Sequence, residues 1–184
     1  DGNNNLWSWG NTSGVRLWLR INSNNTLQFT VTSGNRSTAA TAVKNQWNHV
    51  VCTYSNSTKI ASISINGNPP ENLSGYGADP ITGNTFRMRF GECAWEETAV
   101  NSTVAYGGYL SDVYFVDGLE LEPTAFGYDY ENQGKWAPLD SAVIKQNITD
   151  AGGFGTNGFY LPFDPAATGA NYLTGTNLTG LETV

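Results

Sequence analysis

The sequence predicts an all-β fold, and three observations lead to that prediction. Apolar and polar residues alternate with a period of two along several short segments, as they do in strands that bury one face. Turn-forming residues separate these segments, and 21 of the 184 residues are Gly, which is typical of short strands joined by many turns. Helical periodicity is confined to residues 122–127, where Pro123 suits the first position of a helical turn.

The first half of the chain carries the clearest strands. Residues 15–21 and 26–32 alternate in polarity, and residues 22–25, NSNN, predict the turn of a hairpin between them. Residues 47–54 and 59–66 predict a second strand pair around the turn SNST. Because each of these strands has one apolar face, we expect them to pack as two layers around a core.

Fewer strands are expected later in the chain. Residues 86–90 continue the alternation, residues 108–118 predict a long strand, and residues 159–163, FYLPF, predict a closing strand. Residues 137–158 are interpreted as a loop. Residues 164–184 contain little that can be buried, so we expect an extended tail after residue 163 that packs on the domain or reaches a neighbouring subunit. The predicted organisation is therefore one β-sandwich domain over 1–163 and a tail.

The net charge and the lack of a long apolar run exclude two classes of partner. The net charge is −7, and it divides into seven Lys or Arg against three Asp or Glu in residues 1–91, and two against thirteen in residues 92–184. An acidic chain without a basic tract predicts no nucleic-acid binding, because phosphate neutralisation supplies most of that affinity. No apolar run reaches the roughly 18–20 residues that span a bilayer, so no membrane insertion is expected.

The two cysteines allow one disulfide or none. Cys52 and Cys93 each lie in or just after a predicted strand. A bridge between them would suit an extracellular protein, whereas two buried thiols would give the same pattern. Both alternatives stay open from the sequence.

Residues 46–70, QWNHVVCTYSNSTKIASISINGNPP, resemble the central hairpin of laminin-G-like and concanavalin-A-like jelly rolls. The resemblance implies a two-sheet antiparallel jelly-roll sandwich over roughly residues 5–163. Consistent with this resemblance, we expect Trp47 to be a large buried residue of the core. We also expect a tight turn at Asn66-Gly67. The resemblance specifies no ligand.

A narrower resemblance concerns the later segments VYFVDGLELEPTAFG, GKWAPL and GTNGFYLPF, within residues 113–163. They are similar to segments of virion proteins of tailed phages, notably marine and cyanobacterial ones. This implies a place on the virion surface, in multiple copies and among other virion subunits, with a host-surface glycan as a possible ligand. Eight Asn-x-Ser/Thr sequons favour the alternative of a secreted, glycosylated lectin domain.

The acidic stretch GECAWEE, residues 91–97, raises the question of a glycosidase, which needs two carboxylates. Glucanases of the resembled superfamily carry three acids at a spacing of two on one strand face, and neither this stretch nor the pair Glu120 and Glu122 supplies the third. The only histidine, His49, is an odd number of residues from Cys52, which places their side chains on opposite faces of a strand. We therefore expect no enzymatic activity, and a polysaccharide hydrolase is the third alternative.

Two sets of residues are candidates for binding. Aromatic residues in or beside loops suit a carbohydrate, and the chosen set is Tyr76, Trp95, Tyr106, Tyr109 and Trp136. Outward-facing residues of two strands would make a basic stripe for an acidic glycan or an acidic partner, and this basic stripe is Arg16, Trp18, Arg20, Arg87 and Arg89. Cross-strand pairing with carboxylates, or solvation, is the alternative for the basic stripe. Trp7 and Trp9 share one strand face and predict either core or a sugar-binding surface.

Calcium is the one cofactor that the resemblance suggests, because some members hold Ca²⁺ at the rim of the sandwich through oxygen ligands. The candidate ligands are Asp79, Asp112, Asp117 and Asp164. The alternative for each is an ordinary role in a turn.

Overall fold

The computed structural model describes residues 4–11, 14–32, 34–76, 87–91 and 106–163, without the side chains at 11, 14–16 and 87. The chain divides into two compact units between Gly107 and Gly108. The predicted tail, 164–184, lies outside the described residues, so a domain boundary at residue 163 stays a prediction. Within the described part, no helix is long and apolar enough to cross a bilayer.

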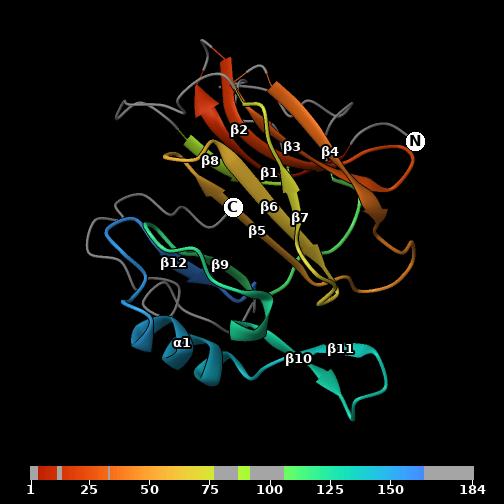
Figure 1. Cartoon of the computed structure of the whole chain (residues 1–184), viewed down its shortest axis with the longest axis vertical. Coiled ribbons are helices and arrows are strands. Elements are labelled where there is room, and N and C mark those ends of the chain that lie inside the picture. The colour runs from red at the N-terminus through yellow and green to blue at the C-terminus, as the bar shows by residue number, and fades with distance from the viewer. Residues whose placement is uncertain (1–3, 12–13, 33, 77–86, 92–105, 164–184) are drawn as a thin grey trace. The chain divides into compact units, whose positions relative to one another are not determined.

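The first unit contains a five-stranded sheet with the strand order β4-β3-β2-β1-β8 (Figure 1). Its strands are β1 (Asn4–Asn11), β2 (Gly14–Ile21), β3 (Thr26–Val31), β4 (Gly34–Thr41) and β8 (Arg87–Phe90). All neighbouring strands are antiparallel. The predicted hairpin between β2 and β3 is confirmed, and the amide of Asn25 donates to the carbonyl of Asn22 at 2.9 Å within its turn.

A three-stranded antiparallel sheet packs on the first one. It consists of β5 (Val50–Ser55), β6 (Ile60–Ile65) and β7 (Glu71–Leu73). The core between the two sheets is apolar and buried, and it is formed by Leu17, Leu19, Leu27, Phe29, Val31, Ala61, Ile63, Ile65, Leu73 and Tyr76. In β2 and β3 the buried core residues recur at every second position, which is the alternation that the sequence shows there. The predicted antiparallel β-sandwich is thereby confirmed.

Trp47 is the one clear error in the predicted core. Its side chain is 70% exposed, and it lies before β5, which begins at Val50 and not at residue 47. The start of the strand is displaced because Asn48 turns the chain: its side-chain amide donates to the carbonyl of Val43 at 2.8 Å and its oxygen accepts from the amide of Val43 at 2.9 Å. These contacts close a loop, and the indole points away from the core.

The second unit is smaller and mixed. It contains β9 (Val113–Phe115), the 3-10 helix η1 (Pro123–Ala125), β10 (Gly127–Tyr130), β11 (Lys135–Pro138), the helix α1 (Ser141–Asp150) and β12 (Phe159–Leu161). The closing strand is confirmed, because β12 pairs antiparallel with β9. The long strand predicted at 108–118 is reduced to three residues. Asp112 before β9 is left-handed with φ +53°, and Gly118 after it has φ +90°, so the extended backbone is limited at both sides.

Helix α1 contradicts the loop predicted for residues 137–158. Asp140 caps the helix, with its carboxylate accepting from the amide of Ala142 at 2.8 Å. Ile144 and Ile148, four residues apart on one helix face, are buried and pack in a second core with Phe154 and Tyr160. An Asp followed by an i, i+4 isoleucine pair is a helix signal that the Gly-rich residues after it obscured.

Candidate ligand-binding face of the five-stranded sheet

Three residues of the basic stripe, Trp18, Arg20 and Arg89, lie on the face of the five-stranded sheet that points away from the core. Trp18 of β2 and Arg89 of β8 are both directly opposite Ser8 of β1. Directly opposite residues in antiparallel strands project from the same face. Because β1 lies between β2 and β8, the two arginine-bearing strands are not neighbours in the sheet. The strand spacing places Trp18 and Arg89 about 10 Å apart along one line across the sheet.

Trp18 and Arg20 form the centre of this face. They are two residues apart on β2, so their side chains share one side of the sheet. The guanidinium carbon of Arg20 lies 5.1 Å from the centre of the Trp18 ring, which is a cation–π contact. The ring therefore holds the guanidinium in place beside it. Arg16 and Arg87 belong to β2 and β8, and their side chains lie outside the described part of the chain.

Polar residues flank this centre in register. Ser8 and Thr30 are opposite Trp18 on its two sides, and both are buried although they face outward. Gln28 of β3 is opposite Arg20. The Nε of Arg20 and the Oε1 of Gln28 are buried without a hydrogen-bond partner. A buried hydrogen-bond donor without a partner, next to a buried acceptor without a partner, is unusual in a folded protein. It marks a place on this face where hydrogen-bonding groups are unused.

No protein carboxylate neutralises Arg20 within the described residues of the first unit. The one Asp or Glu among them is Glu71, and both of its oxygens are already used, by the amide of Ala39 at 2.7 Å and that of Ala40 at 2.8 Å. Burial lowers the pKa of Arg20, because the charged guanidinium is partly removed from water. An anion placed against this side chain would supply the missing opposite charge.

Trp7 and Trp9 belong to the core and not to a sugar-binding surface. Both are partly buried and pack against the apolar cluster between the sheets. The ring of Trp7 stacks with that of Phe29, with centres 6.5 Å apart. Of the two alternatives left open by the sequence, the described contacts support the core.

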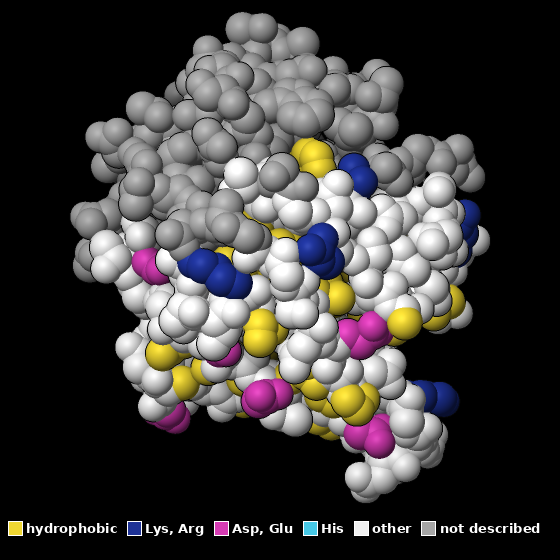
Figure 2. Space-filling view, turned by 45° about the horizontal axis from the view of Figure 1, so that its top comes forward, with side chains coloured by type: hydrophobic (Ala, Val, Ile, Leu, Met, Phe, Trp, Pro, Cys, Tyr) yellow, Lys and Arg dark blue, Asp and Glu magenta, His cyan; other side chains and the backbone are white. Residues whose placement is uncertain are grey.

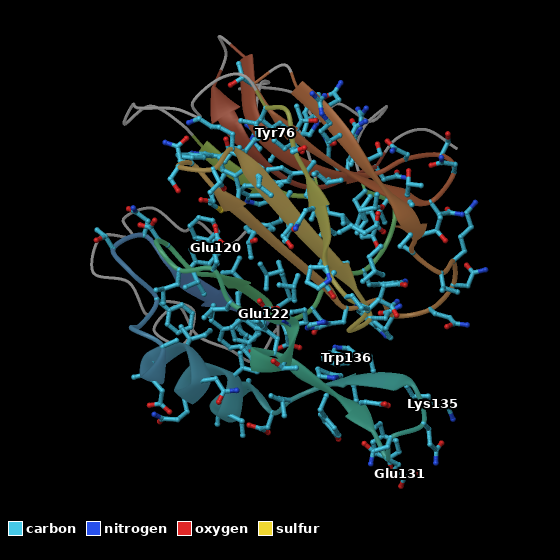
Figure 3. All side chains as sticks on the ribbon, in the orientation of Figure 1. Tyr76, Glu120, Glu122, Glu131, Lys135 and Trp136 are labelled. Carbon is cyan, nitrogen blue, oxygen red and sulfur yellow. The ribbon has the colours of Figure 1, made fainter. Side chains whose placement is uncertain are left out.

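Tyr76 is also a core residue, which contradicts its selection as a sugar-binding aromatic. It is 3% exposed, and its hydroxyl donates to the carbonyl of Phe29 at 3.1 Å. Its ring meets those of Phe29 and Tyr54 edge-on. Figure 3 shows it among the strands of the first unit. The loop after β7 returns into the sandwich at this point, so a ligand cannot reach the ring.

The other predicted aromatics do not gather into one site. Tyr109 is 85% exposed and Trp136 is half-buried, and both belong to the second unit, whereas Tyr106 belongs to the first. Trp136 lies on β11 (Figure 3) and packs so closely over Gly127 that a side chain at that position would clash with the indole. Trp95 lies outside the described residues.

The candidate calcium ligands are not brought together in the part of the chain that the structure describes. Asp112 accepts from the hydroxyls of Tyr160 and Ser111, each at 2.6 Å. Asp117 accepts from the side-chain amide of Asn157 at 2.8 Å. Asp79 and Asp164 lie outside the described residues. Among the residues that are described, no group of three or more His, Cys, Asp or Glu is placed to hold a metal, and the acids are scattered over the face that Figure 2 draws.

The remaining reactive residues show no catalytic arrangement among the described residues. Cys52 packs against the core as a free cysteine, and burial raises the pKa of its thiol to about 12. Cys93 lies outside the described residues, so the two alternatives for the cysteines both stay predictions. Burial lowers the pKa of His49 and so favours its neutral form. The glutamates of GECAWEE lie outside the described residues as well.

The comparison with family models identifies the class of the first unit. Residues 1–119 match the model described as the concanavalin A-like lectin/glucanases superfamily. This is more than half of the chain, so the protein belongs to that superfamily. Comparisons with curated proteins and with solved structures gave no match.

Proposed function

We propose that this protein is a non-enzymatic carbohydrate-binding component that holds a glycan on the outward face of the five-stranded sheet. The observation that carries the proposal is the pair Trp18 and Arg20, an aromatic ring with a cation fixed beside it and no carboxylate to neutralise that cation among the described residues of the first unit. The superfamily of the chain supports carbohydrate as the ligand class.

The mechanism of binding is surface recognition. The apolar face of a pyranose would stack on the Trp18 ring, while the guanidinium of Arg20 donates to a carboxylate or hydroxyl oxygen of the sugar. Arg89, in line with Trp18 across Ser8, would meet a second acidic group of the same glycan. A glycan that carries carboxylates therefore fits this face better than a neutral one.

We infer a virion surface as the setting, with the protein as a capsid decoration, tail or fibre module. This setting is what the resemblance of the segments within residues 113–163 to virion proteins of tailed phages implies. Many copies on one particle would join weak contacts into stable attachment through avidity. The sequons support the alternative setting, a secreted lectin domain of a cellular organism, and intact-mass analysis for N-glycans separates the two.

The test is binding of the purified protein to an array of host-envelope polysaccharides and defined oligosaccharides, with calcium and then with EDTA. We expect binding that survives EDTA, because the described contact residues include no metal site. Trp18→Ala should weaken it about 2- to 12-fold, as expected for one stacking contact, whereas Trp136→Ala, on the second unit, should leave it unchanged. If the wild-type protein, presented in many copies, binds none of the saccharides on the array, carbohydrate binding is refuted. Release of reducing ends from a bound polysaccharide would refute the non-enzymatic assignment.

A further inference from the structure

The loop between β4 and β5 presents a tryptophan to solvent. Trp47 is 70% exposed, whereas the described tryptophans Trp7, Trp9, Trp18 and Trp136 are all partly buried. Leaving a large apolar ring in water is unfavourable, and an isolated exposed ring of this kind is a feature of binding surfaces. Its position at the end of the loop gives it no role in the core.

Hydrogen bonds fix this loop on both sides of the ring. Asn48 exchanges two hydrogen bonds with the backbone of Val43, at 2.9 and 2.8 Å, and donates to the carbonyl of Gln46 at 3.0 Å. Asn66, after β6, in turn donates to Asn48 at 3.2 Å and accepts from the amide of His49 at 2.8 Å. The backbone immediately before and after Trp47 is therefore held, and the loop that carries the ring is preorganised.

The surroundings of the ring fit a sugar better than a protein. Val43 and Trp47 are the large exposed hydrophobic residues of the first unit in the described part of the chain. The surface area of two side chains is far smaller than the roughly 800 Å² that each partner buries in a stable protein interface. Three exposed polar residues lie between Val43 and Trp47 in the loop, namely Lys44, Asn45 and Gln46. One aromatic plane on a loop that also carries exposed amide and amine groups matches a pyranose, which has an apolar face and a rim of hydroxyls.

We propose that Trp47 is a second saccharide contact, separate from the basic stripe, on which one pyranose ring of a glycan stacks. The inference rests on the proposed carbohydrate binding and adds a site to it. The loop follows β4, at the edge of the five-stranded sheet opposite β8, whereas the basic stripe belongs to β2 and β8. The two contacts are therefore on different elements and can be removed independently.

The first experiment measures binding of four variants to immobilised neutral and uronate-bearing oligosaccharides. Trp47→Ala should weaken binding about 2- to 12-fold, the range expected for one stacking contact, and Trp47→Phe should retain part of the affinity. Asn48→Ala should weaken binding with the indole intact, because it releases the loop. Val143→Ala, at a similarly exposed valine of the second unit, is the matched control and should change nothing. Binding of Trp47→Ala within error of wild type would overturn the inference.

The second experiment asks whether the ring is free before ligand is added. The difference in acrylamide quenching between wild type and Trp47→Phe isolates the fluorescence of Trp47. We expect strong quenching without ligand and protection by the bound oligosaccharides. Weak quenching without ligand would overturn the inference and show that the second unit or another copy covers the ring. Weaker binding in Trp18→Ala alone would leave the proposed function standing without this second contact, and no binding by wild type would refute both.

Discussion

Replacing Arg20 by glutamine removes the cation of the candidate site and keeps a polar side chain of similar length. A hydrogen bond to a charged group contributes about 1.5–3 kcal/mol. Arg20 is half-buried, so solvent screens it and the lower end of that range applies. A loss of about 1.4 kcal/mol corresponds to a tenfold weaker affinity. Arg20→Lys keeps the charge but loses the planar donor pair and the ring contact, so we expect an intermediate loss.

The assay is calorimetric titration with sodium polygalacturonate and with the same polymer after its carboxylates are reduced to alcohols. Wild type should prefer the acidic polymer, and Arg20→Gln should lose that preference. Arg36→Gln is the control, because the guanidinium of Arg36 is already bound to the carbonyls of Ser74 and Gly75, each at 2.7 Å. It should lower stability and leave affinity unchanged at equal folded fraction. An Arg20→Gln affinity within twofold of wild type would refute the role of this residue.

Three further predictions concern stability. Tyr76→Phe removes the hydrogen bond to the carbonyl of Phe29 and should lower the free energy of unfolding by about 0.5–1.5 kcal/mol, measured in urea, with no change in glycan binding. Asp140→Ala removes the cap of α1 and should cost about 1 kcal/mol, seen as a shift of the unfolding midpoint at constant m-value. Burial raises the pKa of Cys52 from 9.0 to about 12, so the unfolded thiol ionises first. Stability should be constant below pH 9 and fall as the pH rises towards 12, and Cys52→Ala should reduce that fall; an equal fall in both proteins would contradict the reasoning.

The sandwich could be predicted because apolar and polar residues alternate along β2 and β3. Leu27, Phe29 and Val31 are all buried, as a period of two requires when one face meets a second sheet. Prediction failed where hydrogen bonds from a side chain replace the backbone pairing of a strand. Asn48 binds the backbone of Val43 through its side chain, so the strand starts later, and Trp47 leaves the core. The hydrophobic periodicity of the sequence does not indicate such a pair of side-chain hydrogen bonds.

The composition of the candidate site could be predicted only in part. The outward direction of Trp18 and Arg20 follows from the alternation of β2. That Ser8 lies between Trp18 and Arg89 does not, because β1 and β8 are about 80 residues apart in the chain and their register is fixed by long-range pairing. Tyr76 was misassigned for the same reason, since a tyrosine in a Gly-rich segment has the same local signal whether it faces solvent or returns to the core.

The strength of the candidate site bears on how the protein would work. One stacking contact contributes about 0.5–1.5 kcal/mol, and the screened charged hydrogen bonds of Arg20 and Arg89 contribute about 1.5 kcal/mol each. Their sum is close to the roughly 4.1 kcal/mol that corresponds to a dissociation constant of 1 mM. A single basic stripe would therefore hold a glycan only transiently, and a second contact at Trp47 would add about 0.5–1.5 kcal/mol. Stable attachment to a cell surface would then require many copies that bind together. A monomer that binds an isolated oligosaccharide with submicromolar affinity would contradict this reasoning and would indicate contacts beyond the two described.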